Sequence, residues 1–207
     1  MSKFNYEDTL ILFGRSPFIN EIKEDIPKLI QKYHTMGCNF FCDTFPEVEY
    51  CIFYDDICPK VRPETTIVTN IRHLKNARKR SHKLCTEHYN NAEFYTIVSS
   101  KNADFPFSSI KGVLHFYLHT PSIAFNWAWK KGFKNVIIAG IDLDINAMEH
   151  FDADYTPDKD KCDFKVSTNT NARLHLTKTV TKYLNVYQLN PKSTIEIPKV
   201  TMEELLS

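Results

Sequence analysis

The stretch "TLILFGRSPFINEI", residues 9–22, decides the fold class: an apolar run ends at Gly14, and Ser16-Pro17 opens a helical pattern. A continuous apolar run is typical of a strand buried on both faces, as in a parallel sheet covered by helices. Ser followed by Pro is a common start of a helix, because Pro fits the first turn and Ser can cap it. The stretch therefore predicts a strand, a tight turn and a helix.

Six further runs have strand composition, and they alternate with helical patterns. The runs are 38–42, 50–54, 65–69, 93–98, 135–140 and 185–189. Pro27 should divide the first helical pattern into two shorter helices, because proline removes an internal hydrogen bond. Residues 120–133 repeat the design of the first helix, with Thr120 as the cap, Pro121 at the first helical position and Gly132 as the stop signal. Residues 169–183 form the last helix. We expect one doubly wound α/β domain over residues 1–207, with a mostly parallel, Rossmann-like sheet.

Composition describes an ordinary globular protein. The chain of 207 residues is 43% hydrophobic and 25% charged, and its net charge of +1 predicts no overall attraction to nucleic acid or membranes. No run reaches the roughly 18 apolar residues of a membrane span, no signal-peptide pattern is present, and six cysteines are scattered, so we expect a cytoplasmic protein. Cys38 and Cys42 have no second pair at zinc spacing, so no metal-ligating set is expected.

Two of the five glycines, Gly14 and Gly140, directly follow predicted strands. In open α/β sheets, ligands bind beyond the carboxyl ends of the strands, and a helix N-terminus there can offer N–H groups to a phosphate. The turn at residues 14–16 is therefore a candidate phosphate-binding turn. A plain strand-to-helix connection explains the same residues, since the chain has no G-x-G-x-x-G or G-x-x-x-x-G-K pattern.

Several segments together resemble a known family. They are "ILFGRSPFINEI", "GCNFF", "CIFYDD", "TPSIAFNWAWKKGFKNVIIAGIDLD" and "LNVYQLNPKSTI". In their order and spacing they resemble the bacterial sialyltransferases of glycosyltransferase family 42 and, more loosely, the related archaeal 6-hydroxymethylpterin diphosphokinase-like proteins. The resemblance covers roughly residues 8–60 and 112–195.

The resemblance implies an inverting glycosyltransferase that uses a nucleotide-sugar, with a cytidine nucleotide and no required metal. It implies nucleotide or phosphate contacts at Gly14, Arg15, Ser16, Asn39, His119, Thr120, Ser122, Gly140 and Asp142. The family's catalytic histidine lies shortly before the last helix, where this chain reads "CDFKVSTNTNA" without a histidine. A different sugar, or a different base, fits this chain better than sialic-acid transfer by the family's residues.

Glycosyl transfer needs stabilisation of the leaving group and a base for the acceptor hydroxyl. Arg15 and His119 are candidates for the first task. The candidates for the base are Asp144, His150 and Asp55. The first two lie in a predicted lid or acceptor-side loop at about residues 144–168, although a solvated acidic loop would look the same. Mg²⁺ held by Asp142, Asp144 and a diphosphate stays open, because Mg²⁺ binds through one or two carboxylates and substrate phosphates.

The stretch "NIRHLKNARKRSHKLC", residues 70–85, has six Lys and Arg residues and no acidic residue. A helix here would spread these charges around its circumference, which suits contact with a polyanion backbone. Arg78, Lys79 and Arg80 are therefore candidate contacts to an acceptor such as DNA or a phosphorylated glycan. A solvated connector neutralised by acidic neighbours is the competing interpretation.

Two other functions stay open beside sugar transfer. A diphosphokinase of the hydroxymethylpterin type would require ATP and Mg²⁺, whereas the transferase requires neither. A catalytically inactive nucleotide-binding module is consistent with the missing histidine. The sequence predicts neither the acceptor nor the oligomeric state.

Overall fold

The computed structural model describes residues 3–55, 57, 59–72, 91–143 and 162–207, with the backbone alone for 162–167. The strands are β1 Thr9–Phe13, β2 His34–Cys38, β3 Tyr50–Ile52, β4 Thr66–Asn70, β5 Ala92–Ser99, β6 Val113–Phe116, β7 Asn135–Ala139 and β8 Asn185–Gln188. The helices are α1 Phe18–Glu21, α2 Ile26–Lys32, α3 Phe41–Thr44, α6 Thr120–Lys131, α7 Cys162–Lys178 and α8 Met202–Leu206, with a 3-10 turn η2 at Val180–Lys182. None of these helices combines the length and apolar composition needed to cross a membrane.

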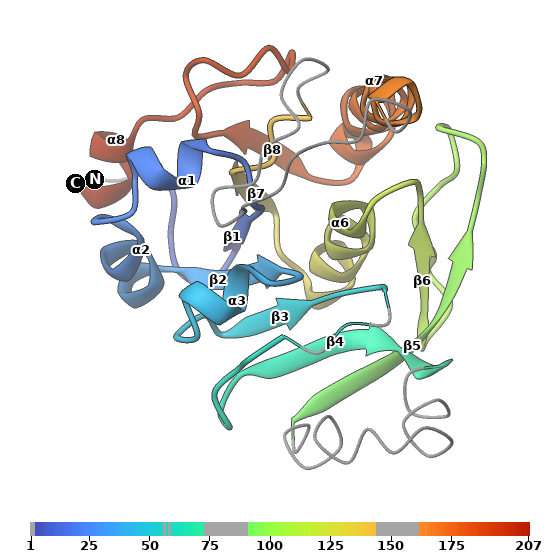
Figure 1. Ribbon diagram of the computed structural model, residues 1–207, viewed down its shortest axis with the longest axis horizontal. Coiled ribbons are helices and arrows are strands. Elements are labelled where there is room, and N and C mark those ends of the chain that lie inside the picture. The colour runs from blue at the N-terminus through green and yellow to red at the C-terminus, as the bar shows by residue number, and fades with distance from the viewer. Residues whose placement is uncertain (1–2, 56, 58, 73–90, 144–161) are drawn as a thin grey trace.

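The strands form one parallel sheet in the order β6-β5-β4-β3-β2-β1-β7-β8 (Figure 1). From β1 the chain adds strands outward to β6, and it then crosses back to place β7 on the other side of β1. The strand order therefore reverses between β1 and β7, which is the topological switch point of a doubly wound sheet. The structure confirms the predicted parallel α/β class.

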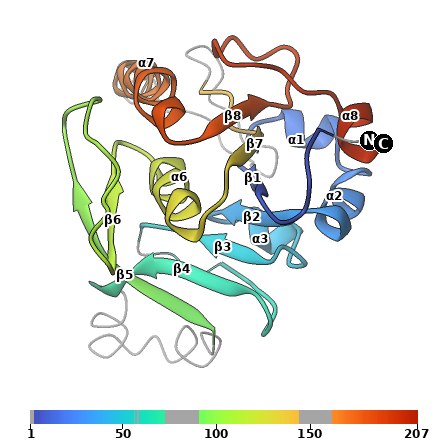
Figure 2. The same ribbon diagram turned by 180° about the vertical axis from the view of Figure 1, so that it is seen from behind.

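Side chains of β1 alternate between two cores. Leu10 and Leu12 pack in the core that α6 and α7 cover, whereas Ile11 and Phe13 pack in the core under α1, α2, α3 and α8. Both views show α6 and α7 on one side of the sheet and α1, α2 and α8 on the other (Figure 2). Burial on both faces explains why β1 is a continuous apolar run.

Helix boundaries follow proline and glycine. Pro27 lies in the first turn of α2, after the separate helix α1, as the sequence predicted. Gly132 ends α6 with φ 90°, a left-handed conformation that glycine adopts without steric cost. The N-cap of α6 is His119, so Thr120 is the first helical residue and not the cap that the sequence indicated.

Three predictions about elements were wrong. Residues 38–42 are not a strand: β2 ends at Cys38, and Phe41 begins the short helix α3, where its ring stacks on Phe13 with 4.8 Å between ring centroids. The helix α7 begins before residue 169, so residues 162–168 belong to it and not to a lid. Ser16 does not cap α1, because its hydroxyl donates to Asp142 instead. The strand β6 and the helix α8 were not predicted.

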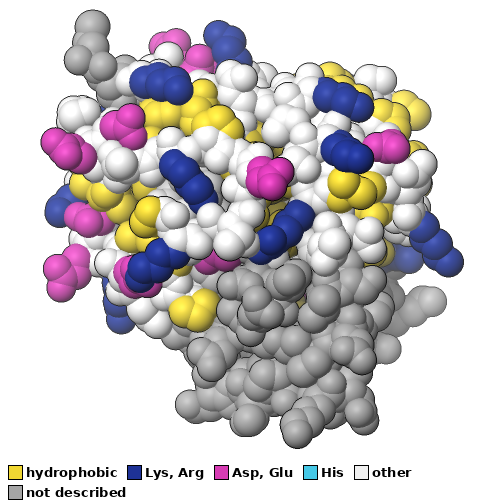
Figure 3. All heavy atoms as spheres, turned by 90° about the horizontal axis from the view of Figure 1, so that it is seen from above, with side chains coloured by type: hydrophobic (Ala, Val, Ile, Leu, Met, Phe, Trp, Pro, Cys, Tyr) yellow, Lys and Arg dark blue, Asp and Glu magenta, His cyan; other side chains and the backbone are white. Residues whose placement is uncertain are grey.

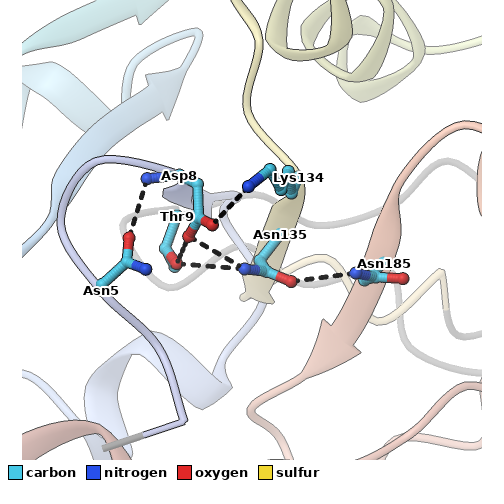
Figure 4. Close-up of polar contacts among 6 residues, drawn as sticks. All are labelled: Asn5, Asp8, Thr9, Lys134, Asn135 and Asn185. Carbon is cyan, nitrogen blue, oxygen red and sulfur yellow. Dashed lines mark hydrogen bonds and ion pairs between the residues drawn. The ribbon is translucent and has the colours of Figure 1, made fainter.

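A polar cluster joins the amino ends of β1, β7 and β8 (Figure 4). Asp8 Oδ1 accepts a hydrogen bond from Asn135 Nδ2 at 3.1 Å, and Asn185 Nδ2 donates to Asn135 Oδ1 at 3.1 Å. The carbonyl of Asp8 also accepts the N–H groups of Lys134 and Asn135, at 2.9 and 3.0 Å. Side chains therefore reinforce the register of three neighbouring strands at the edge opposite Gly14 and Gly140.

Candidate functional site

The carboxyl ends of β1 and β7 meet at Gly14 and Gly140, and neither position has room for a side chain. A Cβ on Gly14 would lie 2.3 Å from the carbonyl oxygen of Gly140. Gly140 has φ 70°, and a Cβ there would lie 2.6 Å from Cγ1 of Ile19. Both glycines are therefore required by the close packing of the turn at residues 14–16 against the end of β7.

Two N–H groups of this turn, those of Gly14 and Ser16, already have partners. Gly14 donates to the carbonyl of Ala139 at 2.8 Å, and Ser16 donates to the carbonyl of Gly140 at 2.9 Å. The helix that follows is only four residues long. A phosphate at this turn would therefore depend largely on side chains, and the turn itself supplies the cation Arg15, whose guanidinium carbon lies 5.5 Å from the centre of the Phe40 ring.

Asp142 is held from two directions. Ser16 Oγ donates to one carboxylate oxygen, and Gln188 Nε2 lies 3.4 Å from the other. Gln188 also donates to the carbonyl of Ile141 at 3.2 Å and to Ser193 Oγ at 3.0 Å. The carboxylate is thus fixed between the turn after β1 and the end of β8, at the switch point.

Gln188 and Arg173 support this region, and the sequence analysis missed both. Gln188 is fully buried at the end of β8, where a long polar side chain in an otherwise strand-like run is the only available signal. Arg173 on α7 donates from Nε to the carbonyl of Leu143 at 2.8 Å and from Nη2 to Thr194 at 2.6 Å. Together they hold the backbone on both sides of Asp142.

Lys199 adds a positive charge near Asp142. Its ammonium group donates to the carbonyls of Ser193, at 2.6 Å, and Asn190, at 3.2 Å. Burial lowers the pKa of Lys199, and the negative charge of Asp142 opposes that shift. Asp142 therefore bonds a hydroxyl, lies near an amide and interacts electrostatically with an ammonium group, each from a separate segment.

A second pair of predicted residues meets beside the switch point. Asn39 directly follows β2, and Thr120 begins α6; Thr120 Oγ1 lies 3.4 Å from Asn39 Oδ1. Thus α6, which crosses the sheet from β6 to β7, brings its first residue to the carboxyl end of β2. Two predicted contact residues that are 81 positions apart in the chain are neighbours.

Backbone strain gathers at the same edge. Asn39, Leu118 and Leu143 have φ values of 55°, 62° and 47°, in the left-handed region, and they follow β2, β6 and β7. Leucine has no local hydrogen bond to offset this conformation, which costs roughly 1–2 kcal/mol. Such strain concentrates at ligand-binding sites, where the surrounding structure enforces it.

The ring nitrogens of His119 are buried and the imidazole is electrically neutral, although the residue as a whole is only partly buried. Burial, with a smaller effect of neighbouring His175, lowers its pKa to about 3. Neither ring nitrogen has a hydrogen-bond partner among the residues that the structure describes. The imidazole is therefore unsuited to act as a cation toward a leaving phosphate at neutral pH.

Other predicted residues are not part of this constellation or cannot be placed. Ser122 is buried, and its hydroxyl bridges the N–H of Tyr117 and the carbonyl of His119. Asp55 is exposed after β3, two strands from β1 and so roughly 10 Å along the sheet. The remaining candidates lie outside the described residues: Asp144, His150, Arg78, Lys79 and Arg80. No group of three or more metal-ligating side chains occurs within the described part of the chain.

Most of the basic stretch, residues 70–85, also lies outside the described residues. Figure 3 looks onto the molecule from above the view of Figure 1, and its Lys and Arg side chains lie interspersed with Asp and Glu. Of the stretch at 70–85, only residues 70–72 are described. The polyanion contact stays a prediction.

No family model, no curated protein and no solved structure matches this chain. The function therefore has to be argued from the site itself.

Proposed function

We propose that the chain binds a nucleotide at the carboxyl ends of β1, β2 and β7 and uses a nucleotide-sugar as a glycosyl donor. The observation that carries the proposal is the pairing of residues that the sequence analysis had selected separately. Ser16 meets Asp142, and Asn39 meets Thr120. These pairs lie at and beside the switch point, where doubly wound sheets bind their ligands.

The described side chains suit two steps of such a reaction. The guanidinium of Arg15 would stabilise the charge that develops on a departing phosphate. The fixed carboxylate of Asp142 would accept a hydrogen bond from a donor hydroxyl or, with a diphosphate, take part in binding Mg²⁺. The base for the acceptor is proposed to be Asp144 or His150, which follow Leu143 in the sequence.

The experiment is a thermal-shift and calorimetric screen with CMP, CDP, UDP, GDP and ATP, each with and without Mg²⁺. We expect a cytidine nucleotide to stabilise the protein without metal, by about 2.7 kcal/mol at a ligand concentration of 100 times Kd. Asp142→Asn should lose at least about tenfold in affinity, equivalent to about 1.4 kcal/mol. Asp25→Asn, at the partly exposed N-cap of α2, is the matched control and should bind like the wild type.

The outcomes separate the functions. Absence of stabilisation by every nucleotide would contradict the proposal. Stabilisation by ATP alone, and only with Mg²⁺, would favour the diphosphokinase. Nucleotide binding without hydrolysis or transfer of a bound nucleotide-sugar would favour an inactive nucleotide-binding module.

A further inference from the structure

His119 has an unusual position: a buried imidazole whose two nitrogens both lack partners among the described residues. A buried polar group without a hydrogen bond is destabilising, and nearly all such groups in folded proteins are paired. An imidazole that served only packing could be replaced by an apolar ring at no cost. The unpaired nitrogens therefore call for a partner that the described residues do not supply.

The backbone of His119 is fixed although its ring is unpaired. Its N–H donates to the carbonyl of Tyr117 at 2.8 Å, and its own carbonyl accepts the N–H of Ser122 at 3.0 Å and the Ser122 hydroxyl at 2.7 Å. The preceding residue, Leu118, is in the strained left-handed conformation. The loop is thus held against its local preference in a way that sets the position of the imidazole.

The titratable group that acts on His119 within the described residues is His175, whose own pKa is also lowered by burial. Thr120 follows His119 in the chain and contacts Asn39, at the end of β2. In doubly wound nucleotide-binding folds, the end of this strand holds the ribose hydroxyls. The charged side chains Arg15 and Asp142 lie instead on the segments after β1 and β7. The uncharged polar groups therefore come from the segments after β2 and β6, and the charged groups come from the segments after β1 and β7, with Arg15 reaching the Phe40 ring beside Asn39.

We propose that His119 binds the uncharged nucleoside part of the nucleotide, donating a hydrogen bond to and accepting one from a ribose hydroxyl or a base edge. This inference rests on the proposed function, and it assigns the phosphates to the charged side chains Arg15 and Asp142. The low pKa of His119 agrees with it, because a neutral imidazole offers one donor and one acceptor. The residue as a whole is only half-buried, so a change of side-chain rotamer is the movement that would let its nitrogens reach a ligand.

The test is His119→Phe, which keeps a ring and removes both nitrogens. Cytidine, uridine, guanosine and adenosine are the probes, and the nucleoside of the most tightly bound nucleotide is the one compared. We expect the affinity of His119→Phe for that nucleoside to be at least about tenfold lower than that of the wild type. Binding of inorganic pyrophosphate should stay within about twofold of wild type, equivalent to roughly 0.4 kcal/mol. The melting temperature of the free variant should not fall, because an unpaired buried group has been removed.

The matched control is His115→Phe on β6. The ring of His115 is bonded to the carbonyl of Pro106, so this variant should lose stability and keep nucleoside affinity. Wild-type nucleoside affinity should also be the same from about pH 5.5 to 8, whereas a cationic His119 would make it rise in acid.

Two results would overturn the inference while the proposed function stands. One is equal nucleoside affinity in His119→Phe and the wild type, and the other is wild-type nucleoside binding that strengthens in acid. Failure of the wild type to bind any nucleotide would instead overturn the proposed function, and the inference with it. If His119→Phe does not fold, His119→Leu is measured in the same way, and nucleoside affinity equal to that of the wild type would again overturn the inference.

Discussion

At the scale of single residues, Gly14 is the position where the β1 turn and β7 come closest. In Gly14→Ala, the new Cβ would meet backbone atoms of Gly140, which cannot move without separating the two strands. We expect the free energy of unfolding to fall by about 3 kcal/mol, the upper range for overpacking a tight contact. Urea denaturation followed by circular dichroism measures it.

Gly112→Ala is the control for Gly14→Ala. Gly112 has φ 73°, but no atom lies within 4 Å of the place that its Cβ would take, so only the left-handed conformation is penalised, by about 1 kcal/mol. Equal losses in the two variants would mean that the close approach of the strands has no energetic role.

His119 gives the stability of the protein a pH dependence. The pKa of His119 is about 3 in the folded state and about 6.5 in a free histidine. Between these values the unfolded chain binds a proton that the folded chain rejects, so the stabilisation is complete above about pH 6.5 and is lost as the pH falls. Between these two pKa values, the free energy of unfolding should change by up to about 1.4 kcal/mol per pH unit.

Urea unfolding at about pH 7, 6 and 5 measures this slope in the wild type and in His119→Phe. The variant should have the shallower slope. Burial also lowers the pKa of His175, although its bond to the Ala103 carbonyl and the charge of Asp104 oppose that shift, so part of the slope stays. Identical slopes would show that His119 is not buried in neutral form.

At the scale of elements, local signals predicted what local interactions determine. The apolar runs of β1 and β7 and the Pro and Gly residues around α6 required no knowledge of distant contacts. Residues 38–42 were predicted to be a strand because apolar residues such as Phe41 and Cys42 fit a buried strand as well as a buried helix. The stacking of Phe41 on Phe13, which the sequence does not reveal, favours the helix α3. The strand β6 is short and carries His115 in its middle, so its composition indicates no strand.

The attachment of α6 to the sheet depends on Glu93 in β5. One of its carboxylate oxygens accepts from Trp127 Nε1 at 2.9 Å and from the Tyr95 hydroxyl at 2.8 Å, and the other lies 2.6 Å from Lys131 Nζ. Glu93→Leu would leave the Trp127 N–H without its partner, and we expect a loss of about 2 kcal/mol. Urea unfolding followed by tryptophan fluorescence measures it.

Glu24→Leu is the matched control for this prediction. Glu24 is exposed between α1 and α2, so its replacement should change the free energy of unfolding by less than about 0.5 kcal/mol. A Glu93→Leu variant as stable as Glu24→Leu would show that apolar packing alone holds α6 against β5.

At the scale of the whole molecule, the sequence predicted which segments contribute to the site better than how side chains act there. Strand ends must share one edge in a parallel sheet, so Gly14, Asn39 and Gly140 could be grouped from strand positions alone. Gln188 and the neutral state of His119 could not be foreseen, because burial and hydrogen bonding depend on the assembled fold.

The two edges of the sheet should separate stability from binding. At the amino edge, Asp8→Ala removes the hydrogen bond to Asn135, and we expect a loss of about 2 kcal/mol in the free energy of unfolding with unchanged nucleotide affinity. At the carboxyl edge, Asp142→Asn keeps the size of a side chain that Ser16 and Gln188 hold, so the loss should appear mainly in nucleotide affinity. Urea unfolding gives the folded fraction of each variant. Calorimetric titration at about 15 °C, near the usual temperature of maximum stability, then measures the nucleotide affinity of both variants. If Asp8→Ala weakens binding by the folded protein as much as Asp142→Asn does, the site is not confined to the carboxyl edge.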